Sequence, residues 1–156
     1  MATTTKYSEL LTGRDPLVVV RENVDLVNAM TSGWDEARFD RPWAPGKWTA
    51  RQVITHLAHT ELALGYRARM ALATPGYTAQ TFNQDDWIAR ETIVTGREAV
   101  AAFAATSRLN AALFEGLSAV DRAVSMSHPE YGSITVDWII HLLPGHQLHH
   151  INQLRS

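Results

Sequence analysis

Two capping boxes mark where two long helices of this chain begin. Thr49-Ala-Arg-Gln52 and Thr95-Gly-Arg-Glu98 each place a threonine three residues before a glutamine or glutamate. In such a pair, each side chain accepts a backbone N–H that the first turn of a helix leaves unpaired. The first box predicts a helix over residues 50–73, ending before Pro75-Gly76. The second predicts an alanine-rich helix to about Leu117.

Two more helices are predicted nearer the ends of the chain. Asp15-Pro16 combines an N-cap aspartate with a proline at the first helical position, and Gly33 is a suitable stop. Towards the other end, Ser133 is expected to cap a final helix that carries Asp137 in its first turns. The third of the four helices should turn four apolar residues inward: Ala99, Phe103, Leu109 and Leu113.

The segments between these helices are irregular. Residues 34–48 contain two prolines and a glycine and are predicted to form a loop. Residues 74–95, between the second and third helices, form an irregular segment with room for a short helix. No segment shows a sustained period of two, so no strand is predicted. The sequence therefore predicts an all-α four-helix bundle in a single domain, residues 1–156.

Composition narrows the function classes. The formal net charge is −2 and basic residues occur singly, which disfavours nucleic acid as a partner. No stretch approaches the roughly 18 apolar residues of a membrane span, and the N-terminus lacks the apolar core of a signal peptide, so we expect a cytoplasmic protein with no membrane partner. The absence of cysteine excludes disulfides, a cysteine-ligated zinc site and a cysteine nucleophile. Any thiol chemistry would use a thiol from outside.

Three of the seven histidines are predicted to face inward together. His146 and His150 are four residues apart on the last predicted helix, so both point to the same side. His150 lies at the centre of the apolar stripe of that helix, with His146 about 40° away. On the second predicted helix, His56 lies at the edge of the apolar face, whereas His59 is about 130° from its centre. The remaining three histidines, at positions 128, 141 and 149, have no comparable orientation.

Burying three imidazoles together is unfavourable unless something compensates. Neutral rings need hydrogen-bond partners, and protonated rings repel one another. A divalent cation resolves both problems, and imidazole suits Zn²⁺, Ni²⁺, Cu²⁺ or Fe²⁺. Three protein ligands would leave a coordination position open, which is the pattern of catalytic sites. The alternative is that these are core or interface histidines bonded to carbonyls and carboxylates.

Three segments together resemble the DinB/YfiT-like proteins, a superfamily of four-helix bundles with a metal site of three histidines. They are Lys47-Trp48-Thr49, the run Val-Ile-Thr-His56-Leu-Ala-His-Thr-Glu61, and the terminal Gly-His146-Gln-Leu-His-His150-Ile-Asn-Gln153-Leu. The resemblance covers the chain from about residue 16 to the end. It implies that His56, His146 and His150 bind a divalent metal ion, with zinc or nickel expected.

The resemblance also implies an activity. Members with known activity join low-molecular-weight thiols such as bacillithiol, mycothiol or glutathione to electrophiles, or use them in isomerisation. Many others are described only as metal-dependent hydrolases, and homodimers are common. We therefore expect a homodimeric metal-dependent transferase that joins a thiol cosubstrate to an electrophilic small-molecule substrate. Two alternatives stay open: a metal-dependent hydrolase of a small substrate, and a non-catalytic bundle that binds a metal or ligand.

No further residue is predicted to be catalytic. Hydrolysis would favour a carboxylate near the metal, but Glu61 lies about 140° around the helix from His56. Asp85 and Asp86 are expected to be solvated loop residues. Arg67 shares the side of His56, and we expect it to extend its charge into water rather than to receive an anionic substrate group. Gln153 is placed to support the histidine pair or to fill the helix seam.

Overall fold

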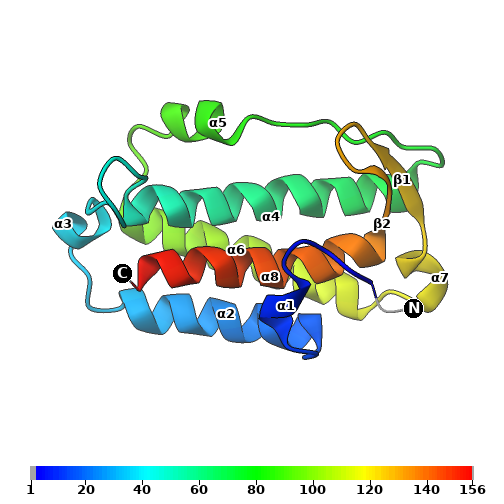
Figure 1. Ribbon diagram of the computed structural model, residues 1–156, viewed down its shortest axis with the longest axis horizontal. Coiled ribbons are helices and arrows are strands. Elements are labelled where there is room, and N and C mark those ends of the chain that lie inside the picture. Colours follow the sequence, from blue (N-terminus) through cyan, green and yellow to red (C-terminus); the bar gives the residue numbers. More distant parts are fainter. Residues whose placement is uncertain (1–2, 156) are drawn as a thin grey trace.

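Four long helices form the body of the protein. The computed structural model describes residues 3–155, so Met1, Ala2 and Ser156 of the predicted domain lie outside the described residues. The long helices are α2 (Pro16–Thr31), α4 (Ala50–Ala73), α6 (Gly96–Glu115) and α8 (Val136–Leu154) (Figure 1). The shorter elements are α1 (Ser8–Leu11), α3 (Glu36–Phe39), α5 (Gln84–Arg90), α7 (Ala119–Arg122), β1 (Ser125–His128) and β2 (Gly132–Thr135).

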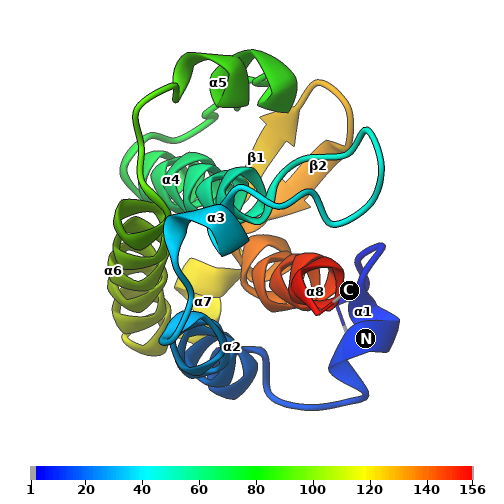
Figure 2. The ribbon, with the colours of Figure 1, turned by 90° about the vertical axis from the view of Figure 1, so that its left-hand side faces the viewer.

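Seen end-on, the long helices lie in the ring order α2, α6, α4, α8 (Figure 2). Helix α4 packs against α6 and α8, and α2 packs against the same two helices from the other side. The consecutive long helices α2 and α4 therefore lie diagonally across the bundle. This order makes α4 and α8 neighbours although they are far apart in the sequence.

Three of the four predicted helix starts are confirmed. Asp15 accepts hydrogen bonds from the backbone N–H groups of the first turn of α2, and α4 runs over the predicted residues 50–73. Both capping boxes form, with Thr49 paired to Gln52 and Thr95 paired to Glu98. These reciprocal bonds satisfy N–H groups that a helix end otherwise leaves unpaired.

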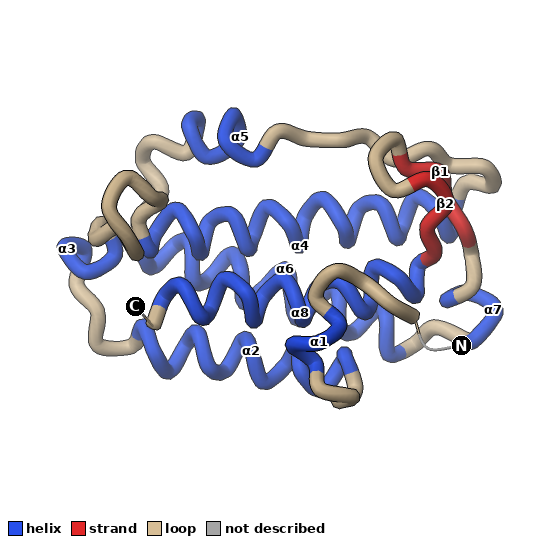
Figure 3. The backbone as a smooth tube through the Cα atoms, viewed as in Figure 1, coloured by secondary structure: helices blue, strands red, loops and turns tan. Residues whose placement is uncertain are grey.

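The end of the chain corrects two predictions. Residues 125–135 form a two-stranded antiparallel hairpin, shown at one end of the bundle in Figure 3. Each strand has four residues, which is too short for alternation to stand out in the sequence. Ser133 pairs with Ser127 in this hairpin, and the cap of α8 is instead Thr135, which accepts from Trp138 N–H. Asp137 lies in the first turn of α8 as predicted.

The inward face of α6 also differs from the prediction. Leu109 was expected inside, but 63% of it is exposed. The adjacent Asn110 is buried instead, because its side-chain amide donates to the backbone carbonyl and the carboxylate of Glu61 on α4. Helix α6 ends at Glu115, two residues before the predicted end.

The core has two apolar clusters separated by a polar layer. One cluster contains Phe39, Phe103 and Ile151, and the other contains Phe114 and Ile139. The residues between them come from all four long helices and are buried: Asn23, Glu61, Asn110 and Gln147. They are joined by hydrogen bonds from Asn23 to Gln147, from Gln147 to Glu61 and from Asn110 to Glu61. Buried polar groups are tolerated when they are paired in this way.

Within residues 3–155, no helix is both long and apolar enough to cross a membrane.

Candidate metal centre

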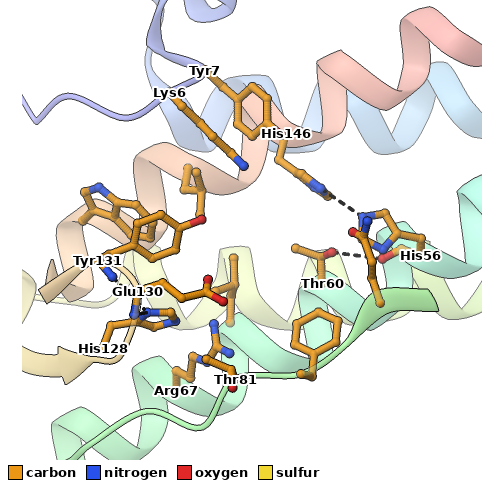
Figure 4. Close-up of a pocket in the computed structure, with 15 residues that line it drawn as sticks. Lys6, Tyr7, His56, Thr60, Arg67, Thr81, His128, Glu130, Tyr131 and His146 are labelled. Atoms are coloured by element: carbon orange, nitrogen blue, oxygen red, sulfur yellow. Dashed lines mark hydrogen bonds between the residues drawn. The ribbon is translucent and has the colours of Figure 1, made fainter. Parts of the chain in front are cut away.

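His56, His146 and His150 converge where α4 meets α8. The Nε2 atom of His146 lies 3.1 Å from Nε2 of His56 and 3.1 Å from Nε2 of His150. One ligand atom from each ring lies within 4.8 Å of the others. Figure 4 shows His146 and His56 pointing toward each other from the two helices, joined by a dashed line. The structure thus brings together the three histidines that the helical faces selected.

Burial keeps these imidazoles neutral. His56 is 3% exposed, and His146 and His150 are each 9% exposed. Burial lowers the pKa of His56 to about 3, with the neighbouring His150 and His59 lowering it further. Burial also lowers the pKa of His150 to about 4, against the opposing effect of its bond to Gln153, and lowers the pKa of His146 well below its ordinary value. Neutral imidazole is the form that binds a metal ion.

The arrangement of nitrogen atoms fits one divalent ion. Two imidazole nitrogens bound to one zinc at about 2.0–2.1 Å lie roughly 3.0–3.4 Å apart for coordination angles near tetrahedral, which matches the two 3.1 Å separations. Within the part of the chain that the structure describes, Nδ1 of His56 and Nδ1 of His146 are buried without a hydrogen-bond partner. The three Nε2 atoms, which face one another, are suited to share a cation.

Gln153 orients one of the three rings. Its Oε1 lies 2.7 Å from Nδ1 of His150, so Nδ1 carries the proton and Nε2 presents its lone pair to the other two histidines. This geometry fits support of the histidine pair better than filling of the helix seam, the other role expected for Gln153. The ring of Trp48 packs 5.1 Å from His56, between ring centroids, and holds it from the side of the 34–48 segment.

The N-terminal segment closes the other side of the centre. Tyr7 packs its ring 5.6 Å from His146, between centroids. This approach depends on Gly145, because a Cβ at that position would lie 2.6 Å from Cβ of Tyr7. This contact was not predictable from the sequence, since the residues before Asp15 carry no helical or family pattern.

Two cavities reach the histidine centre. The first, of about 190 Å³, includes His56 and His146 in its wall (Figure 4). The second, of about 370 Å³, includes His150 in its wall together with Trp43, Trp48 and Gln153. Gln84 of α5 lines both cavities, so the segment between α4 and α6 covers the site. The three histidines therefore stand between two spaces that a small molecule can enter.

Arg67 corrects a prediction. It was expected to extend into water, but it is 7% exposed and lines the first cavity. The segment 77–82 covers it, and its Nη2 donates to the carbonyl of Gln80. This covering segment belongs to residues 74–83, which were predicted to be irregular. The hairpin holds it through two backbone hydrogen bonds, from Ala79 N–H to the Ser127 carbonyl and from Ser127 N–H to the Tyr77 carbonyl.

The carboxylates of Glu61, Asp85 and Asp86 do not contact the histidine centre. Glu61 is 1% exposed and belongs to the polar layer. Burial raises its pKa, although the hydrogen bonds from Asn110 and Gln147 act in the opposite direction. Asp85 and Asp86 are exposed in the first turn of α5, where Asn83 caps them, and Asp85 lies at the rim of the second cavity.

Two histidines outside the centre are more buried than the sequence indicated. His59 is 5% exposed because α5 and its flanking loop cover that side of α4, and its Nε2 bonds to Glu91. His128 is 4% exposed in β1 and lines the first cavity with Glu130 and Tyr131 of the hairpin turn. The burial of these two histidines was not predictable from the sequence, because it depends on the hairpin and on α5, and the sequence placed neither element.

Relatives from two bacteria are similar to most of this chain. A relative from Oceanobacillus iheyensis named "Putative metal-dependent hydrolase OB0782" is 26% identical over 120 residues, covering 76% of this chain and 70% of the relative. A Bacillus cereus protein named "Putative metal-dependent hydrolase" is 23% identical over 141 residues, covering 88% of this chain and 82% of the relative.

Two solved structures share the fold. Bacillus subtilis YfiT, described as "a probable metal-dependent hydrolase with an unusual four-helix bundle topology", superposes with a TM-score of 0.83 at 19% identity, covering 99% of this chain and 88% of YfiT. A mycothiol-dependent maleylpyruvate isomerase superposes with a TM-score of 0.72 at 14% identity, covering 95% of this chain and 62% of that protein. The DinB superfamily model matches residues 20–154. The chain therefore belongs to the DinB superfamily.

Proposed function

We propose that the protein is a metal-dependent hydrolase of a small substrate, with His56, His146 and His150 holding a divalent cation. The observation that carries this proposal is the convergence of three buried, neutral imidazoles, two in the wall of the first cavity and the third in the wall of the second. The names of the relatives from Oceanobacillus iheyensis and Bacillus cereus support the reaction class. Zinc and nickel both accept three imidazole ligands.

The cation would supply the nucleophile and the electrophilic assistance: when bound, it lowers the pKa of water toward about 7 and polarises a carbonyl or phosphoryl oxygen. The protein supplies orientation and burial. Gln153 keeps the proton of His150 on Nδ1, and Trp48 and Tyr7 fix the rings of the other two histidines. Among the described residues, the group that would hold the cation consists of the three histidines alone. No carboxylate belongs to this group, so none is placed within it to accept a proton from water.

The second cavity favours another reaction at the same centre. A space on the His150 side, in addition to the one beside His56 and His146, is suited to two reactants that approach the cation from different directions. Transfer of a low-molecular-weight thiol to an electrophile is such a reaction, since a cation also stabilises a thiolate at neutral pH. The fold shared with a mycothiol-dependent isomerase is consistent with this candidate.

Metal analysis tests the centre. Untagged protein loaded with zinc or nickel should hold one ion per chain, and His146→Ala and His150→Ala should each lose it. His141→Ala is the matched control, because His141 lies on the same helix but its Nδ1 is bonded to the carbonyl of Asp137. Full occupancy in the His146 and His150 variants would overturn the proposed site.

Turnover assays separate the reactions. Hydrolysis of ester, amide or phosphate substrates by the metal-loaded protein without thiol is the expected result. Activity that appears only after addition of bacillithiol, mycothiol, glutathione or cysteine would favour the transferase. Bound metal with a large loss of thermal stability on chelation, and no turnover in either assay, would favour the non-catalytic bundle.

A further inference from the structure

The cavity beside His56 and His146 has an unequal distribution of charge. Two cationic side chains line it, those of Lys6 and Arg67, and among the described residues in its wall there is one carboxylate, that of Glu130. Figure 4 shows the ammonium of Lys6 and the guanidinium of Arg67 extending into the same space from opposite sides. With its imidazoles neutral, the wall is positively charged overall and favours an anion.

Arg67 is held in place but not fully paired. It is 7% exposed, and its guanidinium lies 5.9 Å from the ring centre of Phe82. Among the described residues, its one hydrogen bond runs from Nη2 to the carbonyl of Gln80, whereas a guanidinium carries five N–H donors. Burial lowers the pKa of Arg67, and the nearby Tyr77, Glu130 and Tyr131 oppose that effect. A buried cation with spare donors is costly unless an anion accepts from them.

Glu130 does not fill this role. It lies in the exposed turn between β1 and β2, and no ion pair joins it to Arg67 among the residues described. Its carboxylate offsets part of the charge of Arg67 from a distance and leaves the donors open to a ligand.

The wall of this cavity also contains apolar side chains. Leu64, Phe82, Trp138 and Leu142 line it together with Arg67 and two histidines of the centre. Arg67 follows His56 by three turns on α4, which corresponds to roughly 16 Å between their Cα atoms at a rise of about 1.5 Å per residue. The long side chain of Arg67 shortens that span, because helical side chains lean toward the N-terminus, where His56 lies, and both residues line the same cavity. The space therefore fits a short apolar segment between two polar ends.

We propose that the substrate is a small carboxylate: its carboxylate group binds Arg67, and a short apolar spacer places its reacting group at the histidine centre. The reacting end of this assignment rests on the proposed function, but the anion-binding end rests on the cavity alone. A planar guanidinium suits a carboxylate because it donates two parallel hydrogen bonds.

Equilibrium binding tests the assignment without turnover. Isothermal titration of the zinc-loaded protein compares glutarate with pentanoate. Glutarate can place one carboxylate on the cation and the other on Arg67, whereas pentanoate has the same chain length and a single carboxylate for the two positions. The wild type should bind glutarate at least about tenfold more tightly, the usual scale for a charge-assisted bidentate contact. Arg67→Gln should remove that preference, and Arg67→Lys, which keeps the charge but loses the fork, should reduce it. Arg90→Gln is the matched control, because Arg90 is exposed on α5 and lines neither cavity.

The outcomes separate this inference from the proposed function. An Arg67→Gln variant that folds, retains its metal and keeps the glutarate preference would overturn the inference, as would a wild type that binds both acids equally. If Arg67→Gln does not fold, as judged by circular dichroism, an unchanged preference in Arg67→Lys would overturn it equally. A wild type that shows the preference but hydrolyses nothing would leave the anion site intact and reject the hydrolase.

Discussion

Gln147 donates a hydrogen bond of 2.6 Å to the carboxylate of Glu61, across the seam between α8 and α4. Gln147 directly follows His146, and Glu61 lies on the same helix as His56. The bond therefore ties together the two helices that carry the histidine centre, next to the centre itself. Asn23 holds the other end of Gln147 and also donates to the carbonyl of Pro144 within α8.

Gln147→Ala should lower the free energy of unfolding by about 1–3 kcal/mol. The substitution removes one of the donors to a buried carboxylate and leaves a small void, and hydrogen bonds to charged groups contribute on this scale. Chemical denaturation followed by circular dichroism measures the change. Asn152→Ala, an exposed position on the same helix, should leave the unfolding free energy within about 0.5 kcal/mol. Equal stabilities for the two variants would contradict a stabilising polar layer.

The charge on Glu61 should give the protein a pH-dependent stability. Because burial raises its pKa in the folded state, the folded protein binds this proton more tightly than the unfolded chain does. Its contribution is therefore fully present below the ordinary pKa of a glutamate and is lost as the pH rises through the raised value. Relative to Glu61→Gln, the wild type should lose stability over that pH range. A constant stability difference between the two proteins from pH 4 upward would refute this prediction.

Gln153→Leu should weaken metal binding by about 10–100-fold, the usual effect of removing the partner that orients a ligating histidine. Without the bond to Nδ1, His150 is free to place its proton on Nε2, which faces the other histidines. Competition with a chromophoric chelator measures zinc affinity. Asn152→Ala serves again as the neighbouring control, and an unchanged affinity in Gln153→Leu would argue against a positioning role for Gln153.

Gly145→Ala should loosen the N-terminal segment. The added methyl group would lie 2.6 Å from Cβ of Tyr7 and 2.8 Å from its carbonyl oxygen, so residues near Tyr7 must move away from α8. Such overpacking costs about 1–3 kcal/mol, and we expect a lower melting temperature together with faster proteolysis before Asp15. Gly33→Ala is the control, since a Cβ there meets nothing within 4 Å. Identical melting curves for the two variants would count against the close packing.

The sequence predicted the long helices and the meeting of three inward histidines because both depend on local patterns. Capping residues act within one turn, and the orientation of His56, His146 and His150 follows from position on a helix. The environment of Arg67 and His59 was not predictable in this way. Both became buried because α5 and the segment after α4 fold back over that helix, an arrangement held by contacts with a hairpin some fifty residues later. Leu109 was misplaced because a polar residue, Asn110, takes the inward position that hydrophobic periodicity assigned to an apolar one.

Because of the ring order of the helices, the histidine centre joins two parts of the chain that are distant in the sequence. His56 and His146 are 90 residues apart in the sequence, yet their rings are adjacent. A cation shared between them would close a loop of that length and so reduce the conformational entropy of the unfolded chain. In a protein without cysteine, this coordination would serve as the one strong cross-link available. Metal content would then affect the stability of the folded state as well as its chemistry.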